Sequence, residues 1–293
     1  MYGYFCERDY GGDFCYTDLA SERRRANTDI EGVTFKREKS LGGTWERIKI
    51  TSDEGAKSIG RPKGIYDTLE LERMDLLDLG TIDEAKEEIA KELCYMCDVC
   101  HVIPDKILVV GLGNAALTPD SIGPECAKRV RATMHIGEFD KSFFSSLECS
   151  EIAVLAPSVA SVSGMDALIS IRGVAGIIKP DVVIAIDALA SRSGERLGRT
   201  IQVTNTGIHP GSGLGNSREY LSERSVGVPV IALGIPTVID ARMLTGEASR
   251  DERGRVMSKS PAMFVSPKEI NEIVAVGAEI IGGAINQAFG LYC

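Results

Sequence analysis

The feature that most constrains the fold is a series of apolar runs between residues 107 and 233. Each run is short, rich in Val and Ile and bounded by turn-forming residues, as expected for strands buried on both faces of a parallel sheet. Helical patterns at Glu125–Thr133 and Ala167–Ile178 separate some of the runs. We therefore predict an α/β protein with three α/β/α layers and a mostly parallel central sheet. The predicted strands are Ile107–Gly111, Ile152–Ala156, Val182–Ile186, Thr200–Val203 and Val228–Leu233.

A smaller β-rich part is predicted to precede this core. Val33–Lys36 and Trp45–Ile50 flank Gly42-Gly43, a hairpin turn signal, and Ile65–Leu71 has the composition of a further strand. We expect a single domain from residue 19 onward. Its parts are a β-rich N-terminal addition at 19–80 and an α/β core at 81–293.

Two long helices are predicted in the core. The first covers Thr81–Cys100 and begins with Thr81 and Glu84 at the spacing of a capping box. The second begins at Ser266, an N-cap residue that is followed by a proline, and runs to about residue 288. The polar segment 246–260 is predicted to be a mobile surface loop.

Composition excludes two classes of partner. The net charge of -9 and the pI near 5.1 argue against nucleic acid as a direct partner, because phosphate binding needs a basic face. Met1–Tyr10 lacks the layout of a signal peptide, and no apolar run approaches the length that spans a bilayer. We therefore expect a cytoplasmic protein with no membrane partner.

Three of the eight cysteines, Cys94, Cys97 and Cys100, follow one another at a spacing common in zinc sites. The same spacing puts them near one another on a helix face, where thiols pack as small apolar groups. No second C-x-x-C pair follows, and the chain has three histidines. We favour structural thiols, and a non-catalytic metal-binding module is the alternative.

Chemically useful side chains follow the predicted strands, at the edge where α/β sheets bind ligands. Asp120 and Asp187 come after the strands that begin at residues 107 and 182, and His209 comes after the strand at 200–203. Two nearby carboxylates push their pKa values apart, so that one can activate a water while the other protonates a leaving amine. For a single aspartate, capping of a turn or helix is the simpler explanation. His209 either orients a carboxylate, binds substrate or is a packed structural residue.

Two glycine-rich loops are predicted at the same edge of the sheet. Glycine would let a substrate backbone approach closely where other residues would not. One loop contains Gly111, Gly113 and Asn114, and the other contains Gly211 and Gly213.

The first of these loops also matches a permissive dinucleotide fingerprint, which would make the chain an oxidoreductase. That fingerprint needs a helix to open directly after the glycines, so that its N-terminus holds the pyrophosphate. Pro119 and Gly123-Pro124 would interrupt a helix that began directly after these glycines. Dinucleotide binding is therefore the weaker alternative.

Four blocks between residues 106 and 240 together resemble the germination protease family. In chain order they contain Gly111-Leu112-Gly113-Asn114 with Thr118-Pro119-Asp120, Ile186-Asp187-Ala188-Leu189-Ala190, Gly207-Ile208-His209-Pro210-Gly211, and Pro236-Thr237-Val238. The resemblance implies an atypical aspartic endopeptidase without a cofactor, in which Asp120 and Asp187 are the catalytic pair. It implies that the chain is made as a zymogen and forms a homotetramer. It also implies that the enzyme initiates degradation of small acid-soluble DNA-binding spore proteins in the spore core during germination.

The resemblance extends to a processing site and to a second family. Germination proteases cut after an acidic residue and before a large apolar residue followed by alanine, and Asp18-Leu19-Ala20 has this form. We therefore expect self-cleavage between Asp18 and Leu19, with residues 1–18 as a propeptide-like segment. The core also resembles hydrogenase-maturation endopeptidases, which engage a metal through an acidic pair and a histidine. A metal-dependent endopeptidase is thus the alternative.

Overall fold

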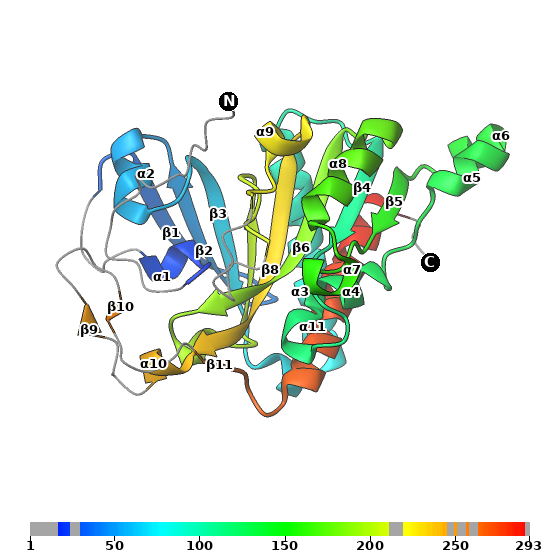
Figure 1. The fold of residues 1–293 in the computed structure, drawn as a ribbon. Coiled ribbons are helices and arrows are strands. Elements are labelled where there is room, and N and C mark those ends of the chain that lie inside the picture. Colours follow the sequence, from blue (N-terminus) through cyan, green and yellow to red (C-terminus); the bar gives the residue numbers. More distant parts are fainter. Residues whose placement is uncertain are drawn as a thin grey trace.

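The computed structural model describes residues 17–23, 30–210, 219–244, 249–250, 256–257 and 263–290. Its centre is a nine-stranded sheet in the order β1-β2-β3-β7-β8-β6-β4-β5, with β11 paired to the end of β8 (Figure 1). A separate pair is formed by β9 and β10. The strands are β1 (Val33–Lys39), β2 (Thr44–Ile50), β3 (Gly64–Glu70), β4 (Lys106–Gly111), β5 (Glu151–Leu155), β6 (Val182–Ser191), β7 (Thr200–Thr204), β8 (Val230–Asp240), β9 (Ser249–Arg250), β10 (Val256–Met257) and β11 (Phe264–Val265).

The sheet is mixed in direction. β5, β4, β6 and β8 are parallel neighbours, whereas β8, β7, β3, β2 and β1 pair antiparallel. The α/β architecture is confirmed, but parallel pairing is confined to half of the sheet. β7 departs from the predicted direction because the connection from Ser191 to Thr200 is too short for a parallel crossover, which takes a dozen or more residues. The β-rich N-terminal strands extend this same sheet.

Helices cover both faces of the sheet (Figure 1). They are α1 (Ala20–Arg23), α2 (Asp53–Ile59), α3 (Leu79–Val99), α4 (Ile122–Ala127), α5 (Met134–Phe139), α6 (Lys141–Ser146), α7 (Ala160–Ser163), α8 (Ala167–Ile178), α9 (Glu223–Val226), α10 (Ala241–Leu244) and α11 (Ile270–Phe289), with 3-10 turns η1 (Met74–Leu76), η2 (Thr118–Asp120) and η3 (Gly194–Arg196).

The alternation of side chains along the strands divides the core between the two faces. On one face, α3, α4 and α11 pack on residues such as Ile201 and Leu233 in the largest apolar cluster. On the other face, α8 packs on Ala185 and Ala232 of β6 and β8, while α1 and α2 pack near Tyr66 of β3. The second face is thus covered at its two ends by separate helices, which leaves its middle for a site.

Several boundaries differ from the prediction. α3 begins at Leu79, because Asp78 is the N-cap and accepts a hydrogen bond from the Thr81 N–H at 2.8 Å. α11 begins at Ile270 with Glu269 at the N-cap position, so Ser266 lies outside the helix. In the predicted loop 246–260, the described residues form the β9–β10 pair, and the others lie outside the described part of the chain.

A buried ionic cluster joins the N-terminal strands to α3. Arg47 on β2 donates hydrogen bonds to Asp67 on β3 at 2.5 Å and to Glu92 on α3 at 2.7 Å. Both carboxylates are buried, with exposed fractions of 1% for Asp67 and 3% for Glu92. Burial, followed by the negative charge of Asp67, raises the pKa of Glu92 to about 8. Burial also raises the pKa of Asp67.

Within the described part of the chain, no helix has the length and apolar character needed to cross a membrane.

Candidate active site

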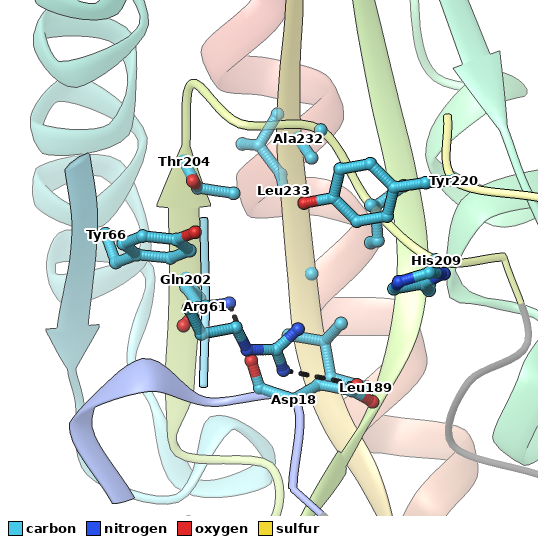
Figure 2. Close-up of a pocket in the computed structure, with 13 residues that line it drawn as sticks. Asp18, Arg61, Tyr66, Leu189, Gln202, Thr204, His209, Tyr220, Ala232 and Leu233 are labelled. Carbon is cyan, nitrogen blue, oxygen red and sulfur yellow. Dashed lines mark hydrogen bonds and ion pairs between the residues drawn. The ribbon is translucent and has the colours of Figure 1, made fainter. Parts of the chain in front are cut away.

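A pocket lies in the middle of the second face, between the parts covered by α2 and α8. Figure 2 shows residues that line it. Strands β6, β7 and β8 form its floor, and the segment at Asp18 lies against it. The space left in it is about 20 Å³, which is room for roughly one water molecule. Residues that line it include Asp18, Arg61, Leu189, Gln202, His209 and Gly234.

One row of paired residues reaches the floor of this pocket at Gln202 and Gly234, whereas its third member, Asp187, does not line the pocket. Asp187 on β6 pairs with Gly234 on β8, and Gly234 pairs with Gln202 on β7. Paired residues point to the same face of a sheet, so Asp187 and Gln202 flank a position that has no side chain. Two strand spacings separate their backbones by about 10 Å. A Cβ at Gly234 would lie 2.5 Å from Leu189 Cγ, so the Leu189 side chain packs over the glycine and requires it there.

Asp187 is buried within β6, with an exposed fraction of 2%. It was predicted to follow the strand, but β6 continues to Ser191 because β8 also extends, to Asp240, and pairs with it. Its Oδ1 accepts a hydrogen bond from the Ala188 N–H at 2.9 Å. The site therefore keeps a buried carboxylate in mid-strand, where burial is costly unless the group is hydrogen-bonded.

Asp120 ends η2, at the carboxyl end of β4. Its Oδ2 and its carbonyl oxygen accept hydrogen bonds from the Asn114 N–H at 2.9 Å and 3.0 Å. The turn is also held by Thr237 of β8, whose hydroxyl donates to the Pro119 carbonyl at 2.6 Å. The turn that ends at Asp120 is thus attached to the loop after β4 and to β8.

The two aspartates flank the same short segment, residues 111–114. Its Leu112 N–H donates to the carbonyl of Ile186, the residue before Asp187, at 2.8 Å. Its Asn114 N–H donates to Asp120. This segment thus connects Asp120 with the residue before Asp187. That the two carboxyl groups meet, and that they act together in catalysis, stay predictions.

Gly111 and Gly113 are required by packing inside the protein. A Cβ at Gly111 would lie 2.3 Å from the Gly123 carbonyl oxygen. A Cβ at Gly113, where φ is +115°, would lie 2.0 Å from the carbonyl oxygen of Asp120. Contact of these glycines with a substrate stays a prediction. The turn η2 also separates the glycines from α4, unlike the direct helix start that a dinucleotide site needs.

His209 lines the pocket and packs edge-on against Tyr220, with ring centroids 4.3 Å apart. Its role in orienting a carboxylate or binding substrate stays a prediction. Gly211 and Gly213, predicted in the neighbouring substrate loop, lie outside the described residues.

The expected processing site lies in the pocket as part of the chain's own structure. The Asp18 N–H donates to the Ala190 carbonyl, and the Ala190 N–H donates to Asp18 Oδ2, both at 2.9 Å. Leu19 and Ala20 are fully buried. Farther along, Glu22 accepts from the N–H groups of Arg192 and Ser193 at 2.7 Å and 3.0 Å. The segment is therefore docked along the end of β6.

Sequence reasoning did not single out Arg61 or Gln202, which hold this segment. Arg61 forms an ion pair with Asp18 at 3.5 Å, and Gln202 donates from Nε2 to the Asp18 carbonyl at 3.1 Å. These residues are 43 and 184 positions from Asp18 in the chain, so no local motif or periodicity marks them.

The cysteine cluster lies at the end of α3, away from the aspartates. Cys94 is exposed, Cys97 is buried and Cys100 is half-buried. Burial raises the pKa of all three thiols, and that of Cys97 reaches about 12. Among the described residues, no group of three or more His, Cys, Asp or Glu side chains is arranged to hold a metal ion. The structural role of the three thiols stays a prediction.

We expect replacement of Cys94, Cys97 and Cys100 by serine to leave proteolysis largely intact. Serine at the buried Cys97 position should lower the stability, because it places a hydroxyl group in the apolar core. Peptide cleavage and metal analysis of the native protein check this. Stoichiometric zinc that disappears together with activity in the triple variant would show that the cluster is a required metal site.

Comparison with known proteins identifies the family. The sequence profile described as germination protease matches residues 14–250. A germination protease of Clostridium perfringens is 36% identical over 315 residues, which cover 93% of this chain and 94% of the relative. Those of Caldanaerobacter subterraneus and Priestia megaterium are 41% and 39% identical, over 77% and 78% of this chain and 69% and 63% of theirs.

Among solved structures, a [NiFe] hydrogenase maturation protease from Thermococcus kodakarensis overlaps 64% of this chain and 97% of its own. The identity is 17% and the TM-score is 0.35, which is too low for a comparison of the two sites. The family profile and the relatives, by contrast, cover most of the chain, including the aspartates and the docked segment. The chain therefore belongs to the germination protease family, a family of peptidases.

Proposed function

We propose that the chain is an endopeptidase that initiates the degradation of small acid-soluble DNA-binding spore proteins in the spore core during germination. It is synthesised as a zymogen that processes itself, and Asp120 and Asp187 form the pair of an aspartic-type mechanism. The observation that carries the proposal is the docking of Asp18-Leu19 on β6, the strand that bears Asp187. Family membership supports a peptidase of spores.

The docked segment supports self-processing through the row that reaches the pocket. Gln202 holds the Asp18 carbonyl oxygen from β7, and Asp187 lies on the other side of Gly234, on β6. The Asp18–Leu19 bond is thus bound next to the row that contains Asp187. Hydrolysis needs the peptide to be held against its acid and base groups, and the proposal gives these roles to Asp120 and Asp187.

The proposed pair acts by general acid–base catalysis, in which it assists the attack of water on the peptide bond. One ionised carboxylate takes a proton from water, and the water oxygen bonds to the carbonyl carbon of Asp18. The protonated partner then donates its proton to the Leu19 nitrogen as the carbon–nitrogen bond breaks. Each such role is worth about 10²–10⁴-fold in rate.

We expect the purified precursor to convert to a form that begins at Leu19, as measured by intact mass and N-terminal sequencing. Leu19→Glu should block this conversion, because Leu19 is fully buried and a charge there cannot dock. Leu41→Glu is the matched control, since Leu41 is exposed. Circular dichroism distinguishes blocked processing from misfolding. A mature form that starts at another residue would contradict the assignment of the site.

We also propose a homotetramer, as the resemblance implies. Light scattering of the native protein should give about four times the chain mass of 31.5 kDa.

A further inference from the structure

We infer that Arg61 and the backbone N–H of Ala190 form the subsite that selects an acidic residue on the N-terminal side of the scissile bond, with Gln202 positioning the peptide backbone. Asp18 of the chain itself occupies this subsite in the structure. The inference rests on the proposed function and names the residues of this chain that give the peptidase its specificity.

The carboxylate of Asp18 is recognised at both of its oxygens. Oδ1 forms an ion pair with Arg61 Nη2 at 3.5 Å (Figure 2). Oδ2 accepts from the Ala190 N–H at 2.9 Å. The side chains of Arg61 and Asp18 are 13% and 12% exposed, so this pair is shielded from solvent. Shielding strengthens a charge interaction relative to one in water. An uncharged isostere in the same place would lose the ion pair with Arg61.

The surroundings of Arg61 favour a negative charge. Arg23 lies beside it, and both guanidinium groups donate to the Thr17 carbonyl. Burial, and then the charge of Arg61, lower the pKa of Arg23 to about 9. Two buried cations side by side repel each other unless an anion accompanies them. When the segment is cleaved and its acidic end leaves, the carboxylate of a substrate can restore that anion.

Gln202 contacts the peptide backbone on both sides of Leu19. Its Nε2 donates to the Asp18 carbonyl at 3.1 Å, and its Oε1 accepts from the Ala20 N–H at 2.9 Å. These contacts do not depend on which side chains the peptide carries. Gln202 therefore holds any peptide in register, whereas Arg61 distinguishes acidic from neutral residues.

The test compares two peptides with the sequence of residues 12–27, one with the natural Asp at position 18 and one with Asn there. For the chain that has processed itself, kcat/KM should favour the Asp peptide by about 10- to 100-fold, the range for a hydrogen-bonded charge. Arg61→Gln should bring this ratio close to one, because cleavage of the Asp peptide falls to the level of the Asn peptide. Arg61→Lys should keep part of the preference, since the charge remains. Gln202→Leu should slow both peptides and keep the ratio.

Arg37→Gln is the control, because Arg37 is an exposed arginine whose ion pairs are with Glu70 and Glu46. It should leave the ratio unchanged. An unchanged ratio in Arg61→Gln, or an equal loss of both peptides in a folded variant, would overturn the inference while the endopeptidase activity stands.

If the wild-type chain cleaves neither peptide, the proposed function fails. A measurement of peptide binding then tests the subsite independently. Fluorescence anisotropy with the same two peptides, in an Asp18→Asn background that weakens the internal occupant, then measures the preference directly. Tighter binding of the Asp peptide that disappears with Arg61→Gln supports the subsite, and equal binding of both peptides refutes it.

Discussion

Asp120→Asn and Asp187→Asn should each fold, form the native oligomer and lose most of the peptidase activity, by about 10²–10⁴-fold. Asparagine keeps the shape of the side chain, and its oxygen can still accept from the Ala188 or Asn114 N–H. It cannot take up or release the proton that peptide hydrolysis requires. Because residues that act as a unit are not additive, the double variant should be little worse than either single variant.

Two assays measure both variants. Intact-mass analysis follows self-processing, and a second assay follows cleavage of a peptide that contains the 18–19 bond. Asp181→Asn is a matched control at the opposite end of β6, where Asp181 accepts a hydrogen bond from the Lys106 N–H at 2.7 Å. It should keep its activity. An Asp120 or Asp187 variant that cleaves near the wild-type rate would remove that residue from the pair. Activity that is lost with a chelator and restored by added metal would make the pair a metal site.

The buried cluster at Arg47 should give the largest effect on stability. Arg47→Met leaves Asp67 and Glu92 buried without their cation, and removing one partner of a buried ion pair costs about 3–5 kcal/mol. We expect a loss of this size at pH 8 and a smaller one at pH 5, where the carboxyl groups can bind protons instead. Urea unfolding at the two pH values measures the difference. An equal loss at both would show that lost packing of the Arg47 side chain, rather than charge, dominates.

Glu92 should also make the wild-type stability depend on pH. Its pKa of about 8 in the folded state lies above the value of 4.5 for an unperturbed glutamate, so the folded chain holds a proton that the unfolded chain releases between these values. The contribution of Glu92 to the free energy of unfolding is therefore complete below about pH 4.5. It falls by about 1.4 kcal/mol per pH unit and is lost as the pH rises through about 8. Glu92→Gln should remove this slope. Glu87→Gln, at an exposed ion pair on the same helix, should not.

The strands of the α/β core could be predicted from the sequence alone, whereas the predicted helix Glu125–Thr133 is α4 at Ile122–Ala127. Continuous apolar runs leave no polar face for solvent, so they form buried strands in any compact fold of this chain. The helix Ala167–Ile178 was predicted with its observed ends, because the Asp166 side chain caps its first turn and Pro180 follows its end. Asp120 and Asp187 were singled out as candidates because polar residues next to apolar strands stand out from the pattern, and their role stays a prediction.

The ends of strands β6 and β8, and the set of residues that meet in the pocket, depend on the tertiary structure. β6 and β8 extend beyond their predicted ends because each supplies the other's backbone hydrogen bonds, a condition that neither segment carries in its own sequence. The same holds for the docked segment. Asp18, Arg61, Ala190 and Gln202 come from four separate parts of the chain, and their charges and hydrogen bonds have no period along the sequence. Only the folded sheet, by pairing β3, β7, β8 and β6 in register, brings them within contact distance.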